Sequence, residues 1–290
     1  MLIALSLLAG SALARDVDDD KTETRDRAAE IDTEHIFGFV EGGDIGERGD
    51  LELEKESALR FGKRAGSYAA VSTLFDLKYV PFEHMLVSPG MLLSYHGISG
   101  VPDFGDRQQI AFQGLWFEAK YQFIDRATSP FGLTLFAAPR WTRIDEKSGE
   151  RADQYSAEFT LSMDKEIVPK VFGALNLIYE PEVSRSRETG EQERETNLGA
   201  GAALSGQVRP GVFVGAEARY LRSHDGLIPN ALKGEAFFLG PTFYTKLTAN
   251  SFMSVAWNAQ VAGRVAGEPG GLDLTNFERH QVRFRLGIEF

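Results

Sequence analysis

The feature that most constrains this chain is a period of two in its apolar residues, repeated in segments of about ten residues between Ile36 and Phe290. Successive side chains of a β-strand point to opposite faces, so each segment has one apolar and one polar face. Helical periodicity does not compete with this pattern, which predicts an all-β fold. The clearest segments are Leu115, Phe117, Ala119, Tyr121 and Phe123; Ala157, Phe159, Leu161 and Met163; and Val212, Val214, Ala216, Ala218 and Tyr220.

The average hydropathy hides this pattern. Mean hydropathy is -0.21, and after the N-terminus no apolar run approaches the roughly 20 residues that a spanning helix needs. The strands of a membrane barrel dilute their own signal, because lipid-facing residues alternate with residues that face the lumen. Closure of the sheet satisfies the backbone polar groups inside a bilayer and leaves no free edge. We therefore expect a closed antiparallel transmembrane β-barrel.

The number of strands follows from counting back from Phe290. About thirteen segments look like strands, but a barrel with both termini in the periplasm needs an even number. We predict twelve strands, with fourteen as the alternative. Leu51–Phe61 is then the first full strand, and residues 36–43 form a short pre-barrel or lumenal strand, because the GDIGERGD stretch that follows them is rich in glycine.

The connections between strands are expected to alternate in length. DRATSP, EIVPK, QVRPG and LTANS are candidate periplasmic turns, and the longer segments rich in glycine, proline and charge are candidate extracellular loops. Pro89, Pro139 and Pro241 fall within predicted strands, where each removes a ladder hydrogen bond, and we expect bulges there. Aromatic residues near strand ends, among them Tyr68 and Tyr179, are typical of interfacial girdles.

The N-terminal end indicates export. MLIALSLLAGSALA resembles the apolar core of a signal peptide that ends in the small-x-small pattern Ala12, Leu13, Ala14, so we expect residues 1–14 to be removed; a buried N-terminal helix is the alternative. Residues 15–34 are dense in charge and are expected to form a periplasmic tail. The alternative is a short helix from about Thr24 that enters the barrel as a plug. Residues 35–290 are assigned to the barrel.

The C-terminal sequence HQVRFRLGIEF is the most specific signal in the chain. Apolar residues alternate up to a terminal aromatic, with Phe284, Leu286, Ile288 and Phe290 on one face. This strand resembles the assembly signal that the outer-membrane insertion machinery binds. The expected partners are therefore that machinery, outer-membrane lipid and lipopolysaccharide.

Together, the signal peptide, the alternating strands and the terminal FRLGIEF resemble porin-like outer-membrane barrels of proteobacteria. The segments FGFVEGGDIGERG, FGLTLFAAPRW and DLTNFERHQVRF are also similar to a widespread barrel family without an established function. The resemblance implies a fold and a location in the outer membrane of a Gram-negative bacterium. It implies no catalytic residue.

If the apolar faces contact lipid, the opposite faces place charges of both signs in one lumen. These groups either line a wet pore, whose field steers ions, or pair across a narrow interior and close it. The candidate lumen-facing residues are Asp76, Lys78, Glu118, Lys120, Arg140, Glu158, Glu180, Glu217, Arg219, Arg283 and Arg285.

Other kinds of chemistry have little support. Cysteine is absent, and the five histidines show no metal-ligand spacing, so no metal or other cofactor is expected. A net charge of -11 argues against nucleic-acid binding. Ser94 and His96 share a strand face, as a barrel esterase would need, but they turn inward and no third residue is identifiable. His224 and Asp225 are adjacent on a strand and so point opposite ways, which makes a protease dyad weak.

These patterns favour a small passive channel or porin-like transporter for ions or small solutes. A structural or binding barrel with a closed lumen is the alternative. A barrel hydrolase is the third hypothesis.

Overall fold

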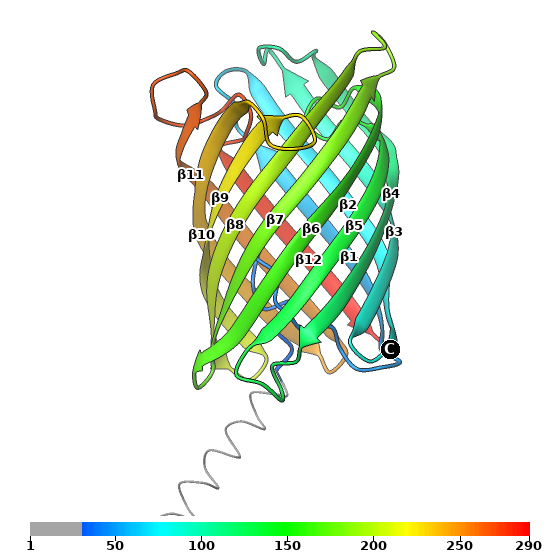
Figure 1. The fold of residues 1–290 in the computed structure, drawn as a ribbon, viewed down its shortest axis with the longest axis vertical. Helices are drawn as coiled ribbons and strands as arrows, with labels where there is room; N and C mark the ends of the chain where they lie inside the picture. The colour runs from blue at the N-terminus through cyan, green and yellow to red at the C-terminus, as the bar shows by residue number, and fades with distance from the viewer. Residues whose placement is uncertain (1–30) are drawn as a thin grey trace, which may run out of the picture.

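The computed structural model describes residues 31–290. Within them, twelve antiparallel strands form a closed barrel in which sequence neighbours pair and β1 pairs with β12 (Figure 1). None of the described residues forms a helix long and apolar enough to cross a membrane. The expected signal peptide, and the part of the expected tail before residue 31, lie outside the described residues. The strands are β1 (Leu51–Phe61), β2 (Ser67–Phe82), β3 (Met85–Ser99), β4 (Arg107–Ile124), β5 (Gly132–Ile144), β6 (Arg151–Val168), β7 (Val171–Ser186), β8 (Gln192–Arg209), β9 (Val212–Asp225), β10 (Leu232–Thr248), β11 (Ser251–Val265) and β12 (His280–Glu289).

The predicted barrel, with twelve rather than fourteen strands, is confirmed. The seam between the first and last strands is regular and runs from Glu52 opposite Glu289 to Phe61 opposite His280. The alternating apolar face that ends at the C-terminus thus pairs directly with the first strand.

The two ends of the barrel differ in their connections. Two-residue turns join β2 to β3, β6 to β7, β8 to β9 and β10 to β11, at the end where the C-terminus lies (Figure 1). His84 and Lys170 adopt positive φ values of 66° and 68° in two of these turns, a conformation that tight hairpins commonly need. The longest connection, residues 266–279, joins β11 to β12 at the other end. We take the short-turn end as periplasmic and the other as extracellular.

The expectation of bulges at the prolines is wrong. The shift in register between β3 and β4 falls at Leu92 and Leu93 rather than at Pro89. Between β4 and β5, the pair Trp116 with Arg140 is followed by the pair Ala119 with Ala137. The two pairs are three positions apart on both strands, so the register around Pro139 is kept. Pro89 and Pro139 each keep their pairing with one neighbouring strand, Pro89 with Phe117 and Pro139 with Ala157. Each proline therefore removes ladder pairs on its other side only, and no extra residue is inserted.

The faces of the strands divide as the alternation requires. On β6, Phe159 and Leu161 are each 39% exposed on the outside, whereas Thr160 and Ser162 are buried inside. Tyr68 departs from its predicted place in an aromatic girdle. It is buried beside Phe104 in the extracellular half, where its hydroxyl donates to the Lys147 carbonyl at 2.8 Å.

Residues 31–50, called the lumenal segment below, precede β1; residues 33–45 lie inside the periplasmic half of the barrel (Figure 1), and residues 46–50 are exposed. Residues 36–43, expected as a short pre-barrel or lumenal strand, are in the lumen but form no strand. Thr33 and Glu34, expected as part of a periplasmic tail, are also buried inside. The segment occupies the place considered for a plug, with an irregular backbone.

Candidate functional site

Polar side chains of the barrel wall hold the backbone of the lumenal segment. An irregular segment has no ladder, so its buried amides and carbonyls need other partners. The Asn176 side chain accepts from the Glu41 amide at 2.7 Å and donates to the Glu41 carbonyl at 2.9 Å. The Glu217 carboxylate accepts from the amides of Phe39 and Val40, both at 3.0 Å. These side chains take the place of a neighbouring strand.

Apolar packing fills the space around the same segment. Ile36, Phe37 and Val40 are each 1% exposed, and burial of such side chains stabilises by roughly 1.5–3 kcal/mol each. The principal core of the protein therefore lies inside the periplasmic half of the lumen. Its wall residues are Phe172, Ala174, Ala203, Phe213, Tyr244 and Phe252.

Two arginines of the closing strand bind the segment by charge. Arg283 lies 2.5 Å from Glu41 and 2.5 Å from Glu56, atom to atom, and Arg285 pairs with both carboxylates as well. Burial alone would raise the pKa of Glu41, but the two guanidinium groups outweigh it and lower that pKa to about 2. Glu41 is therefore ionised at neutral pH, and its charge is compensated by β12.

A second charged cluster crosses the lumen nearer the periplasm. Lys78 Nζ lies 2.9 Å from Glu34, 3.2 Å from Glu52 and 2.9 Å from Glu54, and Lys120 Nζ lies 2.7 Å from Glu34. All of these residues are at least largely buried. We call this cluster the septum; its members are Glu34, His35, Glu52, Glu54, Lys78 and Lys120.

His35 lies at the centre of the septum. Burial and the Lys78 ammonium disfavour a charged imidazole, but the Glu52 and Glu34 carboxylates outweigh them and raise the pKa of His35 to about 9. The ring also stacks on Phe252, with centroids 4.1 Å apart. His35 thus makes both an ionic contact, with Glu52, and an apolar contact, with Phe252.

The septum separates two cavities. A cavity of about 690 Å³ occupies the extracellular part and is lined by loop residues such as Asp103 and Thr275. A cavity of about 210 Å³ at the periplasmic end is lined by residues that include Asn250 and Phe290. Lys78 is the one lining residue that the two share. We call them the larger and the smaller chamber.

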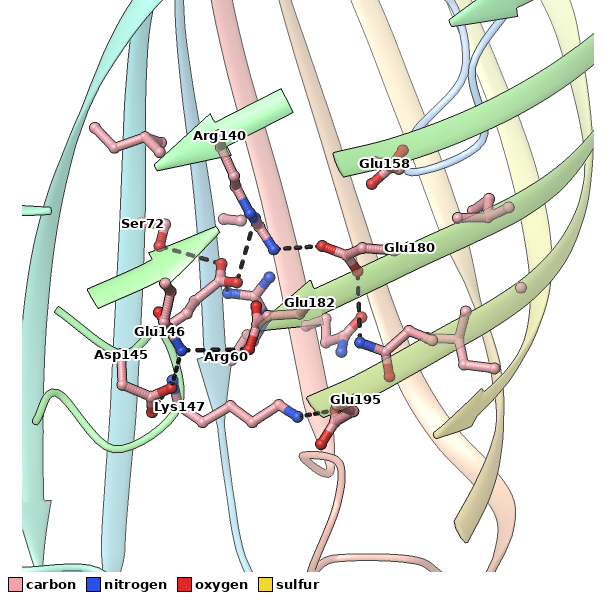
Figure 2. Close-up of a pocket in the computed structure, with 18 of the residues that line it drawn as sticks. Arg60, Ser72, Arg140, Asp145, Glu146, Lys147, Glu158, Glu180, Glu182 and Glu195 are labelled. Carbon is pink, nitrogen blue, oxygen red and sulfur yellow. Dashed lines mark hydrogen bonds and ion pairs between the residues drawn. The ribbon is translucent and has the colours of Figure 1, made fainter. Parts of the chain in front are cut away.

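The connection between β5 and β6 folds inward and narrows the larger chamber (Figure 2). Glu146 in this loop lies 2.5 Å from Arg60 and 3.6 Å from Arg140. Burial alone would raise the pKa of Glu146, but these two arginines outweigh it and lower that pKa to about 2. Lys147, the next residue, reaches Glu195 at 2.7 Å. The extracellular mouth is therefore a network of paired charges.

The structure brings the sequence-predicted lumen residues together. Glu217, 1% exposed, holds the lumenal segment rather than facing a cavity. On the closing strand, Leu286, Ile288 and Phe290 are 36%, 44% and 72% exposed on the outer face, and Phe284 is partly exposed. The other ten predicted residues line the larger chamber: Asp76, Lys78, Glu118, Lys120, Arg140, Glu158, Glu180, Arg219, Arg283 and Arg285.

The residue pairs considered for hydrolysis are not joined in residues 31–290. The Ser94 hydroxyl is buried without a hydrogen-bond partner, while His96 Nε2 lies 3.1 Å from the Glu146 carbonyl. The nucleophile-to-base hydrogen bond of a hydrolase is therefore not formed here. His224 is buried and Asp225 is exposed, as expected of adjacent residues on a strand.

A closed barrel with an apolar outer face and a charged interior is a transmembrane β-barrel of the outer-membrane type. The chain belongs to the family of unknown function DUF6662, which matches residues 29–290. No curated protein sequence matches it.

Solved structures show the same fold at low identity. The COG4313 outer membrane channel from Pseudomonas putida F1 is 15% identical, with a TM-score of 0.59 over 87% of this chain and 100% of that one. The β domain of the Bordetella autotransporter Brka is 12% identical, with a TM-score of 0.52 over 83% of this chain and 100% of that one. The protein thus has the fold of outer-membrane β-barrels.

The residues that the lumenal segment contributes to the site are not predicted by the sequence. The charge pattern places Glu34 in a tail and Glu41 in a pre-barrel strand, and the spacing of the five histidines indicates no common site. One signal was present: Ile36, Phe37 and Val40 are large apolar residues within a glycine-rich, charged stretch. Such residues need a buried partner surface, and a barrel that follows directly offers one.

Proposed function

We propose that the protein is a passive channel for cations and small cationic solutes, shown here in a closed state. The observation that carries this proposal is the charge of the larger chamber, where sixteen carboxylates and ten lysine or arginine side chains are among the lining residues. An excess of fixed negative charge attracts cations into a confined space and repels anions. The likeness to a solved outer membrane channel agrees with this function but, at 15% identity, establishes the fold only.

Opening would require the lumenal segment to move. It is held by side-chain hydrogen bonds, ion pairs and apolar contacts, and not by a β-ladder. Such contacts can break without disrupting the barrel wall. Displacement of Glu34 and His35 would remove part of the septum and join the two chambers into one path.

The test is single-channel recording of the full chain in planar bilayers, with a KCl gradient to measure the reversal potential. We expect discrete openings with a preference for cations. Glu158→Gln and Glu182→Gln, in the larger chamber, should each reduce that preference. The matched control Glu188→Gln, on an exposed loop, should leave it unchanged. A folded wild type that never conducts, or that prefers anions, would overturn the proposal.

The filled periplasmic half favours a second candidate, a structural or binding barrel whose lumen stays closed. In that case heat-modifiable, folded protein would show no openings at any voltage. A barrel hydrolase is the weakest candidate, since it needs the unjoined pair Ser94 and His96.

The partners follow from the outer surface. The exposed apolar belt contacts membrane lipid, as in other barrels of this type. Contact with lipopolysaccharide through the extracellular loops, and with the insertion machinery through the closing strand, are parts of the proposal that fit the outer-membrane location.

A further inference from the structure

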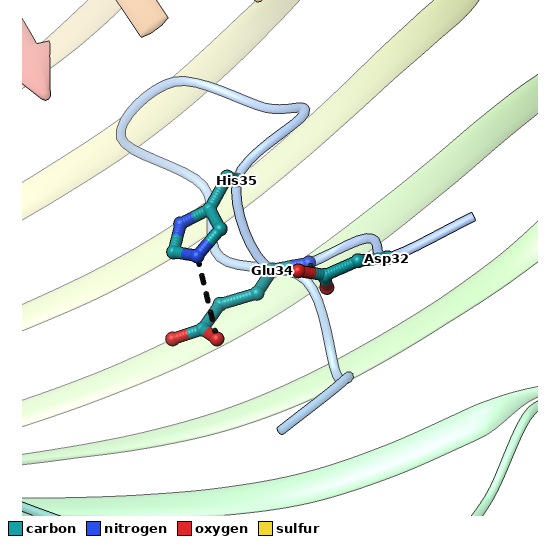
Figure 3. A group of neighbouring side chains, drawn as sticks. All are labelled: Asp32, Glu34 and His35. Atoms are coloured by element: carbon teal, nitrogen blue, oxygen red, sulfur yellow. Dashed lines mark hydrogen bonds and ion pairs between the residues drawn. The ribbon is translucent and has the colours of Figure 1, made fainter. Parts of the chain in front are cut away.

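The septum holds an imidazole between carboxylate oxygens at metal-ligand separations. His35 Nε2 lies 3.2 Å from Glu52 Oε2 and 3.6 Å from Glu34 Oε2. The ligand atoms of Asp32, Glu34 and His35 also all lie within 4.8 Å of one another (Figure 3). Two ligands of a tetrahedral ion with bonds of about 2.0–2.2 Å are separated by about 3.3–3.6 Å. Small shifts would therefore allow one ion to contact the histidine and the surrounding carboxylates.

Lys78 binds the outer oxygens of Glu34 and Glu52 and leaves the inner ones directed at the ring. Its Nζ lies 2.9 Å from Glu34 Oε1 and 3.2 Å from Glu52 Oε1. The Oε2 atoms of the same two side chains are those nearest His35. Lys78 thus does not fill the position between the ring and the carboxylates. It acts as an outer partner that orients two ligands, a common arrangement around bound metals.

The second nitrogen of the ring is an independent indication. His35 is 1% exposed, and its Nδ1 has no hydrogen-bond partner. Nδ1 lies 3.5 Å from Glu54 Oε2, slightly too far for a hydrogen bond. Histidines that bind metals usually donate their other N–H to a carboxylate. Metal binding through Nε2 would leave the proton on Nδ1, and a small approach of Glu54 would satisfy it.

The smaller chamber provides a route to this position. Asp32, Glu34 and Glu52 line it, together with Asn250 and Phe290 at the periplasmic end. An ion from the periplasm can thus reach the carboxylates without crossing the septum.

We propose that Asp32, Glu34, His35 and Glu52 bind one divalent transition-metal ion of the Zn²⁺ class. A mixed set of imidazole and carboxylate ligands suits such ions. The ion takes the place of the proton on Nε2, and Glu54 and Lys78 orient the ligands. Because Asp32, Glu34 and His35 belong to the lumenal segment and Glu52 lies in β1, the ion would fasten the segment to the wall.

The test uses the full, folded chain, purified without a histidine tag and freed of metal with a chelator. Co²⁺ is added and its visible absorption spectrum followed, and Zn²⁺ binding is measured by calorimetry. We expect one ion per chain and a Co²⁺ spectrum typical of nitrogen and oxygen ligands. Both readouts are independent of conductance, so their failure is distinct from failure of the channel proposal.

Variants of the ligands and a matched histidine decide the assignment. His35→Ala and Glu52→Gln should each weaken Zn²⁺ binding at least tenfold, and Glu54→Gln, an outer partner, by about 10–100-fold at most. His224→Ala, distant in the barrel, should bind as the wild type does. Heat modifiability on gels confirms that each variant is folded; if His35→Ala is not folded, Glu52→Gln decides. A folded wild type without stoichiometric binding, or equal affinity in the folded ligand variants, would overturn the site.

Discussion

Arg285 on the closing strand forms an ion pair with Glu41 of the lumenal segment, 244 positions earlier in the chain. Arg283 pairs with the same carboxylate. The strand that completes the barrel therefore also holds the segment that fills it. Closure of the wall and closure of the lumen depend on the same two guanidinium groups.

Reversing both charges should release the segment. In the double variant Arg283→Glu and Arg285→Glu, Glu41 and Glu56 lose their partners and face two further carboxylates. Breaking a buried pair typically costs about 3–5 kcal/mol, so urea unfolding in lipid vesicles should show a loss of that order. The open probability in bilayers should rise. The charge-matched control, Arg194→Glu with Arg209→Glu at exposed positions, should behave as the wild type does; equal behaviour of both double variants would contradict this role for β12.

A disulfide should lock the segment to the wall. A Cβ built on Gly201 would lie 2.9 Å from Val40 Cγ2, close to the separation of about 3 Å between a Cβ and the far sulfur of a disulfide. The chain has no native cysteine, so Val40→Cys with Gly201→Cys gives one defined bridge. Oxidised protein should remain closed in bilayers and reduced protein should open. Each single variant serves as a control, and conduction that ignores a complete bridge would show that this segment does not gate the lumen.

Orientation of the wall can be tested with adjacent residues on β6. Phe159 is 39% exposed on the outside, whereas Glu158 lines the larger chamber. Phe159→Arg should cost about 2–4 kcal/mol if it lies near the middle of the bilayer, because it presents a charge to lipid. Glu158→Arg should cost less, since the chamber is polar. Folding equilibria in vesicles give both values, and equal losses would contradict the assignment of the faces.

How far the sequence predicts this fold is clear from β1 and the lumenal segment. Leu51–Phe61 was predicted as the first full strand with the bounds that the structure has, because alternation along a strand is a local property. The fixation of Glu41 by Asn176 is not local, since the two residues are 135 positions apart. No periodicity marks such a contact. The sequence predicts which polar residues face inward. It does not predict which of them pair with each other and which hold the lumenal segment.

Acid should loosen the segment. The pKa of Glu41 is lowered to about 2 from an ordinary value of 4.5, so its ionised form stabilises the folded state fully above about pH 4.5. This stabilisation, at most about 3 kcal/mol, is lost as the pH falls towards 2. The free energy of unfolding of the wild type, measured with urea, should therefore fall as the pH is lowered from about 4.5 to 2. Glu41→Gln should be less stable at neutral pH and less dependent on acid; an identical pH profile for both proteins would contradict the contribution of Glu41.

The terminal aromatic should matter for insertion more than for stability. Phe290 is 72% exposed, and its backbone amide donates to the Leu51 carbonyl at 2.9 Å. Removing it deletes one hydrogen bond at the end of the seam, which contributes about 1 kcal/mol, and leaves the regular β1–β12 pairing intact. Purified chains lacking Phe290 should thus refold nearly as well as the wild type. In cells, however, fractionation should find less heat-modifiable protein in the outer membrane, because the proposed contact between Phe290 and the insertion machinery would be lost. Phe82→Ala, another exposed phenylalanine at the short-turn end, is the matched control. Equal amounts of inserted protein with and without Phe290 would show that the closing strand is recognised without its last residue.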